Sequence, residues 1–391
     1  MSNVKTNSRL SNRVQQIKPS GIRRFFDLAS KMDNIISLGV GEPDFVTPWN
    51  IREASISSLE RGFTAYSANA GIIELRREIS SYMNKRFSVQ YDPESEVLVT
   101  VGASEAIDIG MRAILNEGDE VIIVEPSFVS YVPLVQMAGG VPVSVGTNNQ
   151  DNFKVSAKQI EAAITDRTKA LMLCFPNNPT GATMSREDML EIALLAERHD
   201  LLVFSDEIYA ELSYDEKHVS FASLPNMKDR TILISGFSKS FAMTGWRLGF
   251  VLAPEDLLSA MLKLHQYSLM CAPTMAQYGA LEALKSGMDD IERMKQSYKQ
   301  RRNYVVKSFK EIGLSCHTPG GAFYAFPSIE STGLTSEQFA EKLLLEERVA
   351  VVPGHVFGAG GEGHIRCSYA TSMDNLEQSV ERIERLLKKL T

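Results

Sequence analysis

Two cations stand in an otherwise apolar, glycine-punctuated part of the sequence. Residues 235–250 read SGFSKSFAMTGWRLGF and carry Lys239 and Arg247, eight positions apart. Lysine and arginine side chains are almost never fully buried in a protein unless they are paired. The segment therefore needs either an anionic partner within the fold or a bound molecule whose chemistry uses both cations.

A carboxylate and one of these cations stand where two successive apolar runs end. Asp206 follows mostly apolar residues in LLVFSDEIY, and Lys239 ends TILISGFSK. A carboxylate in such surroundings is expected to have a positive partner. An ordinary ion pair between two strand ends is one interpretation, and a shared ligand site is the other.

Two further stretches of small or amide side chains also follow apolar runs. Residues 102–104 form a small-residue turn ahead of a helical pattern, where free N–H groups and the helix dipole favour an anion. Residues 177–178 open NNPTG, in which Asn-Pro also marks an ordinary turn. With Tyr209, the carboxylate and the two cations, these groups suit a phosphorylated aromatic cofactor that has a ring nitrogen, a ring hydroxyl and an aldehyde.

The elements that must position these groups form an alternating pattern between about residue 96 and residue 286. Most of the β-rich runs are near-continuous apolar runs, as expected for strands that are buried on both faces. Helical segments lie between them, and the one at 185–200 opens with a capping box from Ser185 to Asp188. The pattern predicts an α/β fold with a mainly parallel sheet, whose ligand site lies outside the carboxyl ends of the strands. The predicted strands are 96–102, 120–126, 141–146, 169–176, 201–209 and 231–239.

The pattern changes after residue 286, which predicts a second, smaller unit. A long helical segment at 288–313 is followed by a few short strands between helices. We expect a connecting helix and a small α+β domain, and we interpret the basic group at 299–307 as a solvated helix face. The predicted division is an N-terminal arm with part of the small domain at 1–45, a large domain at 46–286, and the connecting helix with the C-terminal small domain at 287–391.

Composition excludes several classes of protein. A chain of 391 residues is too long for one core, and a formal charge of -7 disfavours nucleic acid or anionic lipid as a partner. No apolar run reaches the roughly 18 residues that a membrane span needs. Four scattered cysteines and six histidines show no metal-ligand or disulfide spacing, which suits a cytoplasmic protein. The G-x-G-x-x-G at Gly358–Gly363 precedes a strand where a dinucleotide site needs a helix, so we interpret it as a loop.

The chain resembles the pyridoxal-phosphate-dependent aminotransferases of fold type I, class I/II. It is most similar to the bacterial subgroup that includes aspartate, aromatic and alanine aminotransferases. The resemblance implies a mainly parallel seven-stranded sheet in the large domain, a smaller α+β domain, and a homodimer with a shared active site. It extends from about residue 14 over nearly the whole chain and depends on NNPTG, SDEIY, SGFSKSFAMTGWRLGF, ISLGVGEPDFVTP, TAYSANAGIIELRREI, PGGAFYAFP and IRCSYATS.

The resemblance also implies site roles. Lys239 would form the Schiff base with pyridoxal 5′-phosphate and move the proton, while Asp206 would pair with the pyridine nitrogen. An ordinary core aromatic remains the alternative for Phe128, and a surface ion pair remains the alternative for Arg366. The other implied contacts are Tyr209 and Asn178 at the ring oxygen, Phe128 stacked on the ring, Gly102, Ala103, Ser104, Ser238 and Arg247 at the phosphate, Tyr66 at the phosphate of the neighbouring subunit, and Gly41 and Arg366 at the substrate α-carboxylate, near Asn178 and Phe128.

Two departures from the family pattern concern the phosphate and the substrate. Gly236 stands where many relatives carry a serine, so we expect one side-chain contact to the phosphate to be missing. Ser104 stands where some aspartate aminotransferases carry a lysine for the distal carboxylate. Gly236 also excludes a penicillin-binding type of serine hydrolase at this lysine. We expect ping-pong transamination with alanine or an aromatic amino acid favoured over aspartate, and 2-oxoglutarate as acceptor. The alternatives are an aspartate aminotransferase, a β-lyase or synthase on the same scaffold, and a cofactor-sensing transcription regulator, which would need a DNA-binding domain ahead of the fold.

Overall fold

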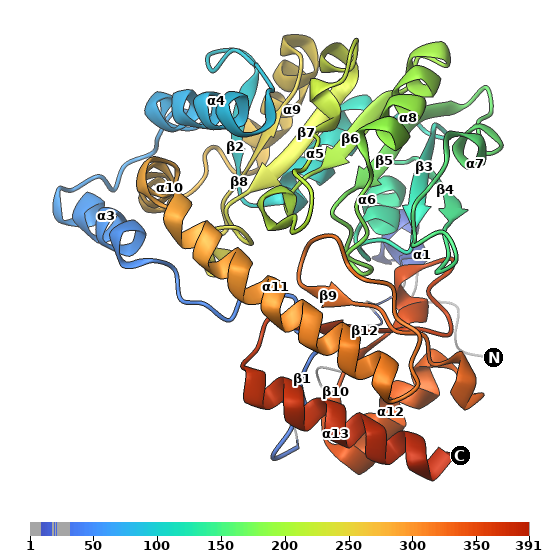
Figure 1. Ribbon diagram of the computed structural model, residues 1–391. Coiled ribbons are helices and arrows are strands. Elements are labelled where there is room, and N and C mark those ends of the chain that lie inside the picture. Colours follow the sequence, from blue (N-terminus) through green and yellow to red (C-terminus); the bar gives the residue numbers. More distant parts are fainter. Residues whose placement is uncertain (1–8, 18, 20, 22–31, 391) are drawn as a thin grey trace.

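A seven-stranded sheet forms the centre of the upper body in the computed structural model (Figure 1), which describes residues 9–17, 19, 21 and 32–390. Its strand order is β2-β8-β7-β6-β5-β3-β4. All six strands predicted in this region are present, and the mainly parallel sheet is confirmed. The strands are β2 (Val97–Thr100), β3 (Glu120–Glu125), β4 (Val141–Gly146), β5 (Thr168–Cys174), β6 (Leu202–Asp206), β7 (Thr231–Gly236) and β8 (Gly249–Leu252).

The seventh strand, β8, was not among the six that the apolar pattern predicted. It has only four residues, and it pairs antiparallel with β2 on one side and with β7 on the other. A short turn connects it to the segment that follows β7, so no helical pattern separates the two strands in the sequence. The strand brings Gly249 against Gly236 of β7. An ideal Cβ on Gly236 would lie 2.9 Å from the Gly249 Cα, so close strand packing favours glycine at this position.

Helices cover both faces of this sheet because alternate strand residues point to opposite sides. Val121 and Ile123 of β3 pack in a cluster with α5 (Ala103–Ile114), α6 (Tyr131–Met137) and α9 (Glu255–Ser268), while Ile122 packs with α7 (Ala157–Glu161) and α8 (Arg186–Arg198). The predicted capping box opens α8, where the Asp188 N–H donates to Ser185 Oγ at 3.2 Å. The β2–β8 end of the sheet is covered by α3 (Trp49–Glu60), α4 (Ile73–Phe87) and α10 (Thr274–Ser286).

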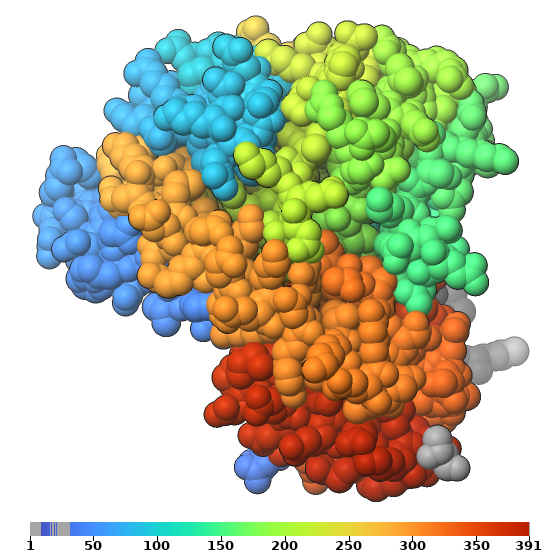
Figure 2. Space-filling model, viewed as in Figure 1, coloured from blue at the N-terminus to red at the C-terminus, as the bar shows by residue number. Residues whose placement is uncertain are grey.

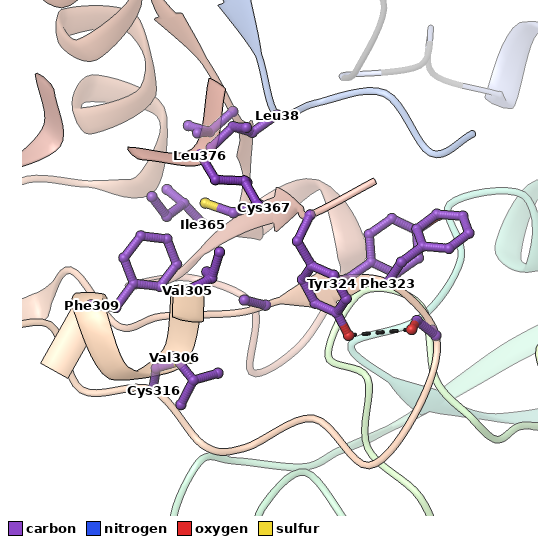
Figure 3. Packing of buried hydrophobic residues seen from close by; sticks show 14 of the residues in the cluster. Leu38, Val305, Val306, Phe309, Cys316, Phe323, Tyr324, Ile365, Cys367 and Leu376 are labelled. Carbon is purple, nitrogen blue, oxygen red and sulfur yellow. Dashed lines mark hydrogen bonds between the residues drawn. The ribbon is translucent and has the colours of Figure 1, made fainter. Parts of the chain in front are cut away.

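A second body is built from the C-terminal part of the chain together with a short N-terminal strand. The long helix α11 (Met288–Glu311) runs from α10 toward this body, and Figure 2 shows the orange and red segments gathered below the upper body. A buried cluster of side chains from α11, β12 and the chain after β1 forms its core (Figure 3). Its other elements are β1 (Ile36–Ser37), β9 (Tyr324–Ala325), β10 (Val349–Ala350), β11 (Val352–Pro353), β12 (Ile365–Ser368), α12 (Ser336–Glu347) and α13 (Met373–Leu390).

The solvated face expected at 299–307 is wrong for two of its arginines. Arg302 is buried, and its Nη1 lies 2.5 Å from Asp215 Oδ2, while Arg301 Nη1 lies 2.8 Å from Asp44 Oδ1. Both partners precede α11 in the chain by a long stretch of sequence. The spacing of basic residues therefore showed a helix, but it could not show that another segment covers that helix.

Three remaining points concern the N-terminal arm, the glycine-rich loop and the search for membrane-spanning helices. The N-terminal arm expected within residues 1–45 lies partly outside the described residues, and the described part contains α1 (Asn12–Gln16). Residues 358–363 form a loop ahead of β12, as expected for a glycine run that opens no helix. Among the described helices, none is both long enough and apolar enough to cross a membrane.

Candidate active site

A cavity of about 710 Å³ lies at the carboxyl ends of β5, β6 and β7. Side chains from both bodies line it, since β12 and the loop after β1 contribute as well as the large sheet. The cavity thus lies at the edge of the sheet where the alternating pattern predicts a ligand site. Eleven of the thirteen site residues expected from the sequence line the cavity: Gly41, Ala103, Ser104, Phe128, Asn178, Asp206, Tyr209, Ser238, Lys239, Arg247 and Arg366.

The Lys239 amine stands three residues beyond β7 and faces the chain that follows β1. Its Nζ donates a hydrogen bond to the Gly41 carbonyl oxygen at 2.6 Å. Burial is the main reason why the pKa of Lys239 falls to about 8; Glu42 opposes this fall, while Arg366 and Arg247 add to it. A larger share of this amine is therefore neutral near physiological pH than for an ordinary lysine, and only a neutral amine is a nucleophile or a base.

The Asp206 carboxylate ends β6 inside the cavity and is 5 % exposed. Burial raises its pKa to about 6, although the Tyr131 hydroxyl and the Ile208 N–H both donate to it and lower the pKa. Tyr131 Oη lies 2.6 Å from Asp206 Oδ2. Asp206 is thus a fixed, mostly ionised carboxylate near neutral pH, and its geometry suits a cationic ring nitrogen.

Tyr131 and Tyr324 are site residues that the sequence analysis missed. Tyr131 begins α6 and orients Asp206, while Tyr324 of β9 shares a 2.8 Å hydrogen bond with the Tyr209 hydroxyl. The Tyr324 hydroxyl also lies against Gly41, where an ideal Cβ would approach it to 2.7 Å. Burial raises the pKa of Tyr209 well above its usual value, so its hydroxyl remains a donor.

The turn at 102–104 and the Arg247 guanidinium face each other and form a cradle for an anion. Gly102 has φ +86°, and an ideal Cβ there would lie 2.7 Å from Arg247 Nη2. The α5 helix begins at Ala103, and the N–H groups in the first turn of a helix have no acceptor within that helix. Arg247 itself donates from Nη1 to the Thr244 carbonyl at 3.0 Å. Free N–H groups, a guanidinium and the absence of a side chain at Gly102 fit a phosphate group.

Arg366 is a buried cation whose partners in the described residues are neutral. It is 4 % exposed; its Nη1 donates to Asn178 Oδ1 at 2.9 Å, and its Nη2 donates to the Gly39 carbonyl at 2.6 Å. No partner for its Nε is found among the described residues. Its guanidinium lies 4.5 Å from the centre of the Tyr324 ring. A buried guanidinium without a carboxylate partner fits a ligand that brings its own carboxylate.

The two asparagines of NNPTG make different contacts. Asn177 accepts the Thr180 N–H at its Oδ1 and donates to the Pro126 carbonyl, so it holds the loop in shape. Asn178 lines the cavity and contacts Arg366. Asn177 therefore fits the turn interpretation, while Asn178 stays a candidate site residue.

Two expected site residues do not line the cavity. Gly102 lies just outside it and forms the close approach to Arg247. Tyr66 is 80 % exposed and does not line the cavity of its own chain. The resemblance implies a contact of Tyr66 with the neighbouring subunit, and its exposure is compatible with that contact.

The donor set fits pyridoxal 5′-phosphate: an amine for the aldehyde, a carboxylate for the ring nitrogen and a cradle for the phosphate. A model of the aminotransferase class I and II family matches residues 33–383. The chain therefore belongs to the class I and II aminotransferases, which are fold-type I enzymes that depend on pyridoxal 5′-phosphate.

Individual relatives cover nearly the whole chain. It is 62% identical to the putative aminotransferase YugH of Bacillus subtilis, over 98% of this chain and 100% of that one. It is 46% identical to the aspartate aminotransferase of Pyrococcus abyssi, over 98% and 100% of the two chains. The crystal structure of the aromatic aminotransferase from Pyrococcus horikoshii superposes with a TM-score of 0.90 at 46% identity, over 95% of this chain and 100% of that one.

The reactivity of Lys239 should depend on pH in a way that other lysines do not share. Carbamylation of Lys239 by cyanate in the cofactor-free enzyme is expected to reach half its maximal rate near pH 8, because only the neutral amine reacts. An ordinary lysine reaches that point at about pH 10.4. Peptide mass spectrometry over a pH series measures the rate at each lysine separately.

Two charge-removing variants test the cause of this pH dependence. Glu42→Gln removes a charge that raises the pKa of Lys239 and should move the midpoint to lower pH. Arg247→Gln removes a charge that lowers it and should move the midpoint to higher pH. A wild-type midpoint at about pH 10 would contradict the assignment.

Proposed function

We propose that this aminotransferase takes its amino group from alanine or an aromatic L-amino acid in preference to aspartate, with a 2-oxoacid such as 2-oxoglutarate as acceptor. The observation that carries the proposal is the lining of the cavity. Among the described lining residues, the cations are Lys239, Arg247 and Arg366. We assign one to each of the amine chemistry, the phosphate and the α-carboxylate, which leaves none for a distal carboxylate.

The rest of the lining supports an apolar substrate side chain. Val40, Ile107, Phe128 and Ile208 contribute apolar side chains to the cavity, and Ser104 is a small, neutral residue at the phosphate turn. A carboxylate moved from water to such a surface without a partner loses much of its hydration energy. The relatives include aspartate aminotransferases and aromatic aminotransferases by name, so their names do not decide the preference.

We assign the catalytic steps to the residues that face the cavity. When bound, pyridoxal 5′-phosphate supplies an electron-withdrawing ring that stabilises negative charge at the substrate Cα. Arg366 holds the α-carboxylate by two parallel hydrogen bonds, and this contact orients the Cα proton toward Lys239. The Lys239 Nζ accepts that proton as general base and would return it, as general acid, to C4′ of the cofactor. Asp206 keeps the ring nitrogen protonated through its negative charge.

A donor panel tests the substrate preference. We expect kcat/KM for alanine or an aromatic amino acid to exceed that for aspartate by about tenfold or more, since a close charge pair is worth at least about 1.5 kcal/mol. Ser104→Lys should raise kcat/KM for aspartate by about tenfold, because it supplies the missing cation. Ser104→Ala is the matched control and should leave the ratio unchanged. A wild-type enzyme with a large aspartate preference would rule the proposal out.

We also propose that the enzyme is a homodimer in which Tyr66 reaches the phosphate site of the partner. Large exposed apolar side chains cluster on the segments around Tyr66, which is typical of a protein–protein interface. The Asn69 side chain donates to the Met270 carbonyl at 2.7 Å and so joins two of these segments. The exposed side chains are Val46, Trp49, Ile56, Leu59, Tyr66, Tyr267, Leu269, Met270 and Met275.

Mixed dimers test the shared site directly. A dimer of one Lys239→Ala chain and one Tyr66→Phe chain would contain one site with the wild-type lysine and the wild-type tyrosine, if Tyr66 acts across the interface. In the purified mixed dimer, one of the two sites should therefore have wild-type cofactor affinity, as measured by cofactor titration. Affinity that stays at the Tyr66→Phe level after mixing would show that Tyr66 does not act in the partner's site.

A further inference from the structure

A buried acid–histidine pair lies behind the 102–104 turn and has no part in the steps above. Glu105 is the third residue of α5, and His265 lies near the end of α9 with 0 % of its surface exposed. Glu105 Oε1 and His265 Nδ1 are 2.6 Å apart. Since a carboxylate can only accept, the ring donates from Nδ1.

The same carboxylate also holds the backbone immediately ahead of the turn. Glu105 Oε2 accepts the Val101 N–H at 2.5 Å, and Val101 directly precedes Gly102. Gly102 is the N-cap residue of α5 and has no side chain with which to cap the helix. Glu105 reaches back over the first turn, as the acid of a capping box does, and fixes the chain one residue further out. Through Glu105, the α9 helix is thus connected to the entry of the turn.

The pair carries two costs that call for a compensating gain. Glu105 places a negative charge in the helix turn that we assign to a phosphate, where like charges repel. His265 Nε2 is buried and has no hydrogen-bond partner among the described residues, which is unusual for a buried polar atom. A leucine at residue 265 would avoid the second cost. In return, the hydrogen bonds from His265 and Val101 to Glu105 fix the direction in which the N–H groups of the turn point.

We propose that Glu105 and His265 are positioning residues for the cofactor phosphate, acting through the Val101–Ser104 backbone; the inference rests on the proposed role of that turn. They touch neither the cofactor nor the substrate. Their effect is to hold the N–H groups of the turn opposite Arg247 before the phosphate arrives, so that binding does not have to order them. The pair therefore acts on retention of the cofactor and not on recognition of the amino acid.

The test compares three variants of the holoenzyme with a control. His265→Leu removes the donor at similar volume, His265→Asn keeps a donor near the position of Nδ1, and Glu105→Gln leaves one acceptor oxygen for two donors. His199→Leu, at the end of α8, is the matched control. The readouts are the rate of cofactor release after dilution, the ³¹P chemical shift of the bound phosphate, and KM for the amino donor.

We expect His265→Leu to release the cofactor about tenfold faster, the effect of one lost hydrogen bond to a charged group, and to shift the ³¹P resonance. His265→Asn should stay within about threefold of wild type, and Glu105→Gln should lie between the two. KM should not change in any variant. Glu105→Gln keeps the test decisive if His265→Leu does not fold.

Two results would overturn the inference alone. One is wild-type release and an unchanged ³¹P shift in both His265→Leu and Glu105→Gln. The other is equally fast release from His265→Leu and His265→Asn, which would indicate that the ring only fills space. If Arg247→Gln instead had the same ³¹P chemical shift as wild type, the proposed phosphate site would be overturned, and the inference with it.

Discussion

Replacing Lys239 with alanine is expected to lower the rate of transamination by about 10⁴-fold or more. Proton transfer by a positioned side chain alone contributes about 10² to 10⁴, and this variant loses the covalent attachment of the cofactor as well. The Lys239 amine is partly buried, has a pKa of about 8 and donates to the Gly41 carbonyl. The described lining of the cavity contains no second lysine that could take its place. Steady-state rates with the best amino donor measure the effect.

The absorbance spectrum gives an independent readout of the same variant. The visible band that reports the covalent link between lysine and cofactor should disappear in Lys239→Ala, while the phosphate contacts still retain the cofactor. Lys307→Ala, at an exposed lysine of α11, is the control and should keep both band and rate. Unchanged activity and an unchanged spectrum in Lys239→Ala would refute the assignment.

Replacing Arg366 with glutamine is expected to lower kcat/KM for every amino donor by about 10²-fold or more. Truncating one partner of a buried, hydrogen-bonded charge pair costs about 2 to 5 kcal/mol or more, and each 1.4 kcal/mol corresponds to a factor of ten. Arg366 is buried between Asn178 and Gly39, and both of these partners are neutral, so its charge is directed to the ligand. Arg366→Lys keeps the charge without the planar fork and should lie between wild type and glutamine.

A donor without an α-carboxylate separates this role from a structural one. A simple primary amine cannot use the guanidinium, so it should react equally slowly with wild type and with Arg366→Gln. If Arg366→Gln slows the simple amine as much as it slows the amino acids, then the arginine supports the fold and does not bind the carboxylate.

Most strands of the large sheet were predictable because they are near-continuous apolar runs and because helical patterns separate them in the sequence. Asp206 and Lys239 stood out for the same reason, since a charge after an apolar run is visible in one dimension. By contrast, β1 has only two residues, too few for a periodic signal, and no helical pattern separates the four-residue β8 from β7. β1 also pairs with β10, and β8 with β2, both of which are distant in the sequence.

Tyr131 and Tyr324 could not be predicted because their roles depend on contacts between distant parts of the chain. Tyr131 meets Asp206 across 75 residues, and Tyr324 meets Tyr209 across 115. An aromatic residue in a helix or a strand has no local feature that distinguishes a site residue from a core residue. The roles assigned to the cavity residues and the division at residues 45 and 286 remain predictions.

The glycine at residue 236 has a steric explanation in the packing of β7 against β8. Its departure from the family pattern suggested a lost phosphate contact. The neighbouring strand approaches so closely that a Cβ would lie 2.9 Å from the Gly249 Cα and 3.1 Å from the Leu248 carbonyl oxygen. Steric exclusion is therefore sufficient to explain the glycine, and serine at this position would require the two strands to separate.

One side of the end of α9 contacts Glu105, and the other side is exposed. In our proposals this helix end therefore couples cofactor binding to subunit association. His265 points inward to Glu105, while Tyr267, two residues later, is 91 % exposed among the apolar side chains that we assign to the subunit interface. If association braces this helix end, dilution should accelerate loss of the cofactor. By thermodynamic reciprocity, loss of the cofactor should then weaken the dimer by the same factor.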